Sequence, residues 1–133
     1  MTSPFTSRVR RASAVAAAAV GIAVLSAAHA PFHLRLLRSA PDANAAIAAA
    51  PESIRLWFSQ TPELAVTTVK VTGPGTAVVA LAPLTRGDSS LVVAPVKGKM
   101  AAGSYTVSWR TMAKDGHVAR GTFGFTIAPA GAP

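Results

Sequence analysis

The residues best suited to chemistry in this chain are three histidines and one aspartate. His29 and His33 lie near the N-terminus, whereas Asp115 and His117 flank Gly116 near the C-terminus. The sequence has no other histidine and no cysteine, so no thiolate is available as a ligand or nucleophile. Imidazoles and a carboxylate suit a divalent cation, and Cu(II) binds such donors more tightly than its neighbours in the series. A fold that joins the two ends of the chain would make a metal site.

The first 28 residues have the features of a secretory signal peptide. A basic start is followed by an alanine- and valine-rich run from 12 to 25 and then by small residues, and the run is marginal for crossing a bilayer. We expect cleavage after Ala28, although Ala30 also fits by side-chain size and a retained anchor is the alternative. The basic residues of the start are Arg8, Arg10 and Arg11.

Cleavage after Ala28 would make His29 the first residue. Its α-amino nitrogen and its ring Nδ1 could then chelate one ion, because the amine has a pKa of about 7.7–8.0 and holds its proton weakly near neutral pH. Cleavage after Ala30 would remove His29 from the mature protein.

The distribution of positive charge along the mature chain argues against nucleic acid as a partner. After the leader, ten of the thirteen Lys/Arg remain against five Asp/Glu, a net charge of +5. These cations are scattered along the sequence and do not form a basic stripe interleaved with aromatics. A solvated basic surface is the interpretation that we favour.

The mature chain has the pattern of an all-β domain, which we place at residues 29–128, with a flexible tail at 129–133. Short alternating runs are separated by proline and glycine, and a helical turn is an option at 45–50. Ile54, Leu56 and Phe58 share one face of a strand, as do Tyr105, Val107 and Trp109, and Tyr105 resembles a tyrosine corner. We expect an immunoglobulin-like β-sandwich of about seven strands, at 33–39, 53–59, 64–72, 76–81, 90–94, 103–110 and 121–127.

The spacing of Asp115 and His117 allows two interpretations. In an extended segment, residues two apart lie on one face and could bind the same ion. Asp-Gly is also a common hairpin turn, in which His117 would be an ordinary surface residue. His33, at the start of a predicted strand, also allows two interpretations: a metal ligand or an ordinary strand residue.

Four segments together resemble the CopC-like copper-resistance proteins. They are His33 to Pro41, Ile54 to Ser59, Gly103 to Arg110, and Asp115-Gly116-His117 followed by Gly121 to Phe125. The resemblance spans the mature chain in order. It implies a cupredoxin-like Greek key sandwich in the periplasm that binds one Cu(II) per chain for copper resistance or for delivery to a CopD-like transporter of the inner membrane.

The implied metal ligands are His33, Asp115 and His117, with His29 as a further candidate. By its spacing to Pro41, His33 matches the family's N-terminal histidine, so either His33 binds through its ring alone or the preceding residues fold back and His29 supplies amine and ring. Gln60 stands where some members carry a glutamate, and Met100 and Met112 form no cluster for Cu(I).

We expect a monomer with no enzymatic activity, since no nucleophile motif is present. Two other functions are open. One is a metal-free module that docks on a membrane partner, and the other is an oxidative copper enzyme that needs a free N-terminal histidine.

Overall fold

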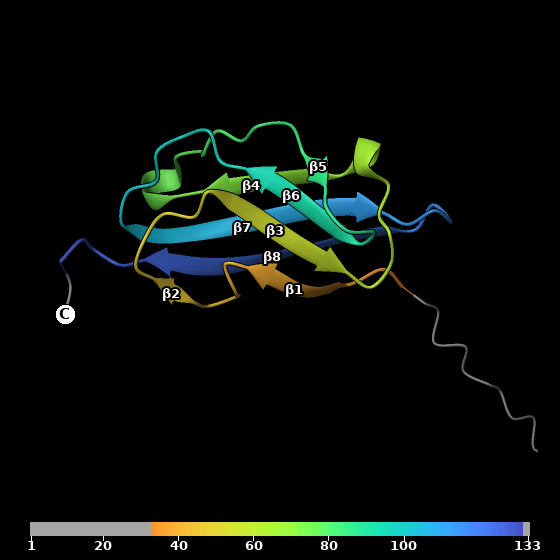
Figure 1. Ribbon diagram of the computed structural model, residues 1–133, viewed down its shortest axis with the longest axis horizontal. Coiled ribbons are helices and arrows are strands. Elements are labelled where there is room, and N and C mark those ends of the chain that lie inside the picture. Colours follow the sequence, from red (N-terminus) through yellow and green to blue (C-terminus); the bar gives the residue numbers. More distant parts are fainter. Residues whose placement is uncertain (1–32, 132–133) are drawn as a thin grey trace, which may run out of the picture.

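Two four-stranded sheets make up the protein, which a computed structural model describes over residues 33–131 (Figure 1). The strand orders are β1-β3-β6-β5 and β2-β8-β7-β4, and every pairing is antiparallel except that of β2 with β8. The strands are β1 (Leu36–Ala40), β2 (Ala46–Ile47), β3 (Ser53–Phe58), β4 (Thr68–Thr72), β5 (Thr85–Arg86), β6 (Leu91–Pro95), β7 (Gly103–Met112) and β8 (Val118–Ile127).

The core lies between the sheets and follows the alternation of the sequence. Ile54, Leu56 and Phe58 on β3 are buried, as are Val107 and Trp109 on β7. The rings of Phe58 and Trp109 meet edge to face with centroids 5.2 Å apart, which joins the two sheets. The predicted all-β sandwich is therefore confirmed.

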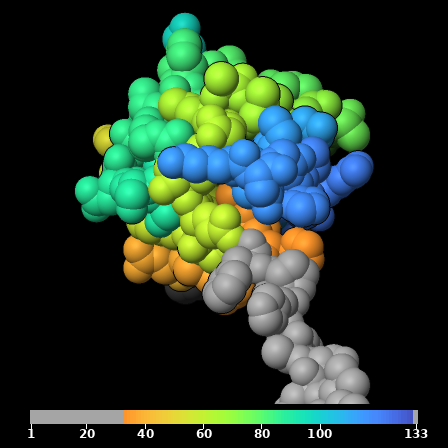
Figure 2. Space-filling model, turned by 90° about the vertical axis from the view of Figure 1, so that its right-hand side faces the viewer, coloured from red at the N-terminus to blue at the C-terminus, as the bar shows by residue number. Residues whose placement is uncertain are grey.

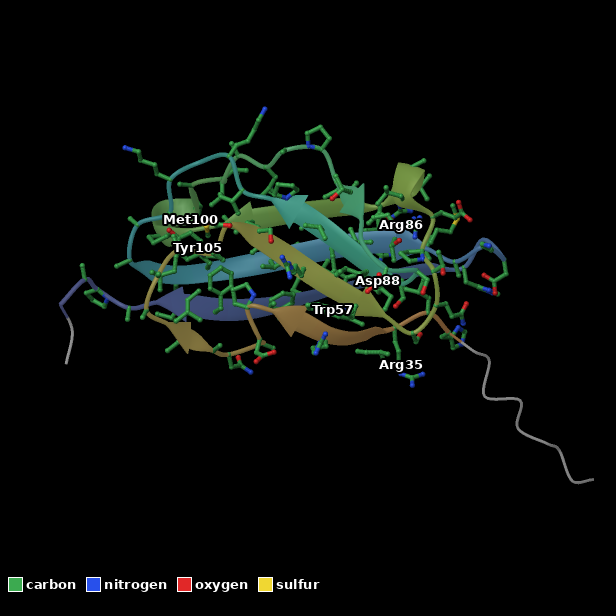
Figure 3. The ribbon with its side chains drawn as sticks, viewed as in Figure 1. Arg35, Trp57, Arg86, Asp88, Met100 and Tyr105 are labelled. Carbon is green, nitrogen blue, oxygen red and sulfur yellow. The ribbon has the colours of Figure 1, made fainter. Side chains whose placement is uncertain are left out.

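The predicted tyrosine corner is also present. The hydroxyl of Tyr105 donates to the carbonyl oxygen of Ala101 at 2.6 Å, and its ring stacks on Phe125 at 5.4 Å. This hydrogen bond ties the segment before β7 to the sheet. It lies at the end of the sandwich opposite to the β7–β8 turn, beside buried Met100 (Figure 3).

Two of the predicted elements are wrong. The segment 76–81 forms no continuous strand, because it crosses between the sheets: Val78 bridges to Thr72 in one sheet and Leu81 bridges to Val96 in the other. The optional helical turn at 45–50 is instead the short strand β2, which pairs in parallel with the end of β8.

Other strand bounds shift by a few residues. The first strand begins at Leu36 rather than at residue 33, and Leu64–Val66 forms a 3-10 turn (η1) before β4. A second 3-10 turn (η2, Pro74–Thr76) follows β4, with Gly75 at φ +67°. Within residues 33–131, neither helix is long and apolar enough to span a membrane. The predicted leader and His29 lie outside the described residues.

Candidate metal centre

The turn between β7 and β8 presents Asp115 and His117 at one end of the sandwich. The amide of Gly116 donates to the carbonyl of Ala113 at 2.9 Å, and the amide of Ala113 donates to the carbonyl of His117 at 2.9 Å. Gly116 has φ +88°, which glycine adopts without the cost that a side chain would impose. The result is a three-residue hairpin loop, 114–116, closed by Ala113 and His117.

Asp115 contacts His117 twice within this loop. The backbone amide of His117 donates to Oδ1 of Asp115 at 3.0 Å, and Nδ1 of the His117 ring lies 2.8 Å from Oδ2. Both interactions lower the pKa of Asp115 below its ordinary value of 3.8, the side-chain hydrogen bond most of all. The residues meet through a turn and not, as one interpretation proposed, on one face of an extended strand.

This contact leaves one nitrogen of His117 for a ligand. A carboxylate that accepts Nδ1–H fixes the orientation of the ring and directs the lone pair of Nε2 outward, as carboxylates beside metal-binding histidines do. The side chains of His117 and Asp115 are 69% and 56% exposed, so an ion could reach them directly from solvent.

His33 reaches the same place from the other end of the described chain. Its ring centroid lies 5.9 Å from that of His117, with the ring planes at 88°. Next to it, Leu34 is buried in the core and fixes the backbone. Figure 2 looks onto this end of the sandwich, where the orange residues that open the described chain lie beside the blue β7–β8 hairpin.

Ser59 holds the His33 segment in position. Its Oγ accepts a hydrogen bond from the amide of Arg35 at 3.0 Å and donates to the carbonyl of His33 at 3.3 Å. Its own amide donates to the carbonyl of Arg35 at 2.9 Å. The residues alone did not predict this role, although Ser59 ends one of the four segments that carry the family resemblance, Ile54 to Ser59.

A groove of about 520 Å³, which we call the histidine groove, joins His33 to His117. Its lining includes His33, Leu34, Trp109, His117 and Arg120. Gln60 is not among its lining residues, and Met100 lies near the opposite end of β7 (Figure 3). Neither side chain therefore adds a donor to the groove as it stands.

The structure brings three of the four predicted ligands together but does not arrange them as a complete cage. Among residues 33–131, no three His, Asp or Glu side chains converge as a ready metal-binding group. The two imidazoles meet edge to face, and Asp115 faces the ring of His117. These side chains are exposed, so they can turn toward a common ion, and further ligands would come from solvent or from residues before His33.

Residues 36–128 match the CopC domain family. The chain belongs to the CopC family. It is 33% identical over 97 residues to Protein YobA of Escherichia coli K12, an alignment that covers 71% of this chain and 78% of that protein.

Two solved structures resemble this CopC-family chain. The crystal structure of PcoC, a methionine-rich copper resistance protein from Escherichia coli, is 33% identical with a TM-score of 0.66 and covers 71% of this chain and 98% of its own. CopC from Methylosinus trichosporium OB3b is 24% identical with a TM-score of 0.68, covers 76% and 99% of the two chains, and supports the fold. The predicted family is therefore confirmed.

Proposed function

We propose that this CopC-family protein binds one Cu(II) per chain at the edge of the histidine groove and holds it for copper resistance or delivery. The observation that carries the proposal is the approach of His33 to His117, with ring centroids 5.9 Å apart although the residues are separated by most of the domain. His33 and His117 would be imidazole donors. Asp115 would orient the ring of His117 or bind the ion through its carboxylate.

The donor set favours Cu(II) over softer ions. The groove offers the imidazoles of His33 and His117, the carboxylate of Asp115 lies beside His117, and Cu(II) prefers such nitrogen and oxygen donors. The chain has no cysteine. The two methionines of the described residues do not supply a thioether pair here: Met100 is buried near the other end of β7 and Met112 is half-buried.

His29 is the candidate for a further ligand. If processing leaves it as the first residue, its amine and ring could close on the ion held by His33 and His117. Otherwise His33 would bind through its ring alone. In both cases the carbonyl and amide contacts of Ser59 with His33 and Arg35 hold the near end of that segment beside His117.

The setting that we propose is the periplasm, reached through the N-terminal leader. Copper would be held as cargo by a monomer and passed to a CopD-like transporter of the inner membrane. The protein would not act as an enzyme, because the candidate residues provide ligands and no activated nucleophile.

Electron paramagnetic resonance of the Cu(II)-loaded protein tests the ligand set. We expect nitrogen couplings from imidazole in the wild-type spectrum, and one fewer coupled nitrogen in both His33→Ala and His117→Ala. A spectrum that neither substitution changes would contradict the proposal. In that case, a metal-free protein that docks on a membrane partner would be the better interpretation.

A further inference from the structure

The outer face of the sheet β4-β7-β8 carries three cations that the copper proposal does not use. Lys70, Arg110 and Arg120 are all exposed. Arg110 lies directly opposite Arg120 across β7 and β8, and Lys70 lies opposite Ser108, two residues along β7 from Arg110. The three side chains therefore share one region of one face, which lies behind the other sheet in Figure 1.

No carboxylate of the described residues neutralises this region. All five Asp and Glu side chains of the protein fall within residues 33–131, yet none forms an ion pair with Lys70, Arg110 or Arg120. Like charges that face each other directly across two strands destabilise a sheet. An anion bound from outside the chain would relieve this repulsion between Arg110 and Arg120.

The cations border a groove of about 390 Å³, which we call the cationic groove. Its lining comprises the three cations and hydroxyl-bearing side chains from all three strands: Lys70, Arg110, Arg120, Thr68, Ser108 and Thr122. These side chains offer hydrogen-bond donors together with positive charge, which is what binding of an oxyanion requires.

Beneath the cationic groove, on the inner face of the sheet, Gly121 packs against the buried ring of Trp109. A Cβ on Gly121 would lie 2.7 Å from Cζ2 and 3.1 Å from Nε1 of Trp109. The indole, including its N–H edge, therefore occupies the space that a side chain at 121 would need. Because side chains alternate across a strand, Trp109 faces the core and contacts Phe58, whereas Ser108 and Arg110 face the groove. The cations and hydroxyl-bearing side chains are therefore the groups that a ligand in the groove would meet.

The chemistry favours carboxylates of a protein over a membrane surface. The guanidinium group of arginine matches a carboxylate with two parallel hydrogen bonds, and two arginines and a lysine could hold successive acidic residues. Membrane-binding faces add exposed apolar side chains to their charge. The large exposed hydrophobics within residues 33–131 are Leu37, Val66, Val78 and Val118, and none of these lines the cationic groove.

We propose that the cationic groove binds an acidic segment of a partner protein, with its carboxylates against Arg110, Arg120 and Lys70. The proposal does not depend on copper. Arg120 lines both the cationic groove and the histidine groove, so a bound acidic segment would lie beside His33 and His117. Such a partner would be placed where the proposed cargo is held.

Fluorescence anisotropy with a labelled hexaglutamate peptide tests this proposal on the processed, metal-free protein. We expect saturable binding, and a loss of about tenfold or more in the double variant Arg110→Gln/Arg120→Gln, since hydrogen bonds to charged groups are among the stronger ones. A matched control, Arg55→Gln/Lys97→Gln, removes the same charge from residues outside the cationic groove and should weaken binding only slightly.

Ser108→Glu provides a second variant that keeps both arginines and places a negative charge in the groove. It should abolish peptide binding, and thermal unfolding of each variant would verify that it is folded. Equal losses in the two double variants, or no binding by the wild type, would overturn the proposal. Binding to vesicles containing phosphatidylglycerol without binding to the peptide would overturn it in favour of a lipid surface.

Discussion

The two ends of strand β7 differ in how far their side chains are buried and in what those side chains contact. At the Gly103 end, Tyr105 is buried, stacks on Phe125 and donates to a backbone carbonyl. At the Met112 end, the strand passes into an exposed loop in which Asp115 and His117 contact each other in solvent. One end therefore stabilises the sandwich and the other leaves donors accessible, so substitutions at the two ends should affect different measurements.

His117→Ala should have the largest effect on copper. It removes the imidazole that Asp115 orients, and we expect Cu(II) affinity to fall more than about 100-fold. The melting temperature should hardly change, because the side chain is 69% exposed and such surface changes are usually within about 0.5 kcal/mol. Competition titration would measure the Cu(II) affinity, and calorimetry on the same sample would measure the melting temperature. A large loss of stability would show that the Met112 end of β7 also stabilises the fold.

Asp115→Asn should weaken copper binding by about 10–100-fold, as loss of a partner of a metal-binding histidine typically does. The amide keeps the size of the carboxylate but lacks the charge that the contacts with His117 stabilise. Asp88→Asn, in the loop between β5 and β6, is the matched control and should leave affinity unchanged. Equal affinities for Asp115→Asn and the wild type would remove Asp115 from the site.

Acidification should weaken copper binding by about tenfold or more between about pH 7 and about pH 5.5, because each imidazole must lose a proton before it binds. Asp115 should not contribute to this change. Its pKa lies below 3.8, so its contacts with His117 persist as the pH falls and are lost only below its ordinary titration range. A pH titration of affinity would show the slope, and a flat profile would argue against histidine ligands.

Ser59→Ala should weaken copper binding several-fold by releasing the His33 segment, since a hydrogen bond contributes about 0.5–1.5 kcal/mol. Ser59→Thr, which keeps the hydroxyl, should restore most of the affinity. The nitrogen couplings in the spectrum of Ser59→Ala should report a disturbed His33. Unchanged affinity in Ser59→Ala would mean that the segment needs no such support.

Tyr105→Phe should leave the Cu(II) affinity unchanged. It removes the hydrogen bond to Ala101 and should lower the free energy of unfolding by about 1 kcal/mol. Denaturant unfolding would measure this loss, and the copper titration should match the wild type. A change in copper affinity would mean that the two ends of β7 are coupled.

The sequence predicted most strands because burial alternates along them, as on β3 and β7. It did not predict the crossing of 76–81 between sheets, because a segment that pairs briefly with each sheet has the same composition as a strand. The prediction that His33 lies near His117 rested on the family resemblance, since no local pattern encodes a contact between residues so far apart. The support from Ser59 depends on hydrogen bonds to the backbone, which side-chain types do not reveal.

In the proposed site, His33 and His117 bind the same Cu(II) ion. A Cu(II) competition titration on protein exported and processed by its own leader, with intact mass recorded on the same sample, tests it most directly. We predict tight binding of one Cu(II) per chain that is lost in His117→Ala, and the mass will show whether His29 begins the chain. Binding no tighter than that of scattered surface histidines, and equal in His117→Ala, would mean that His33 and His117 do not form a copper site.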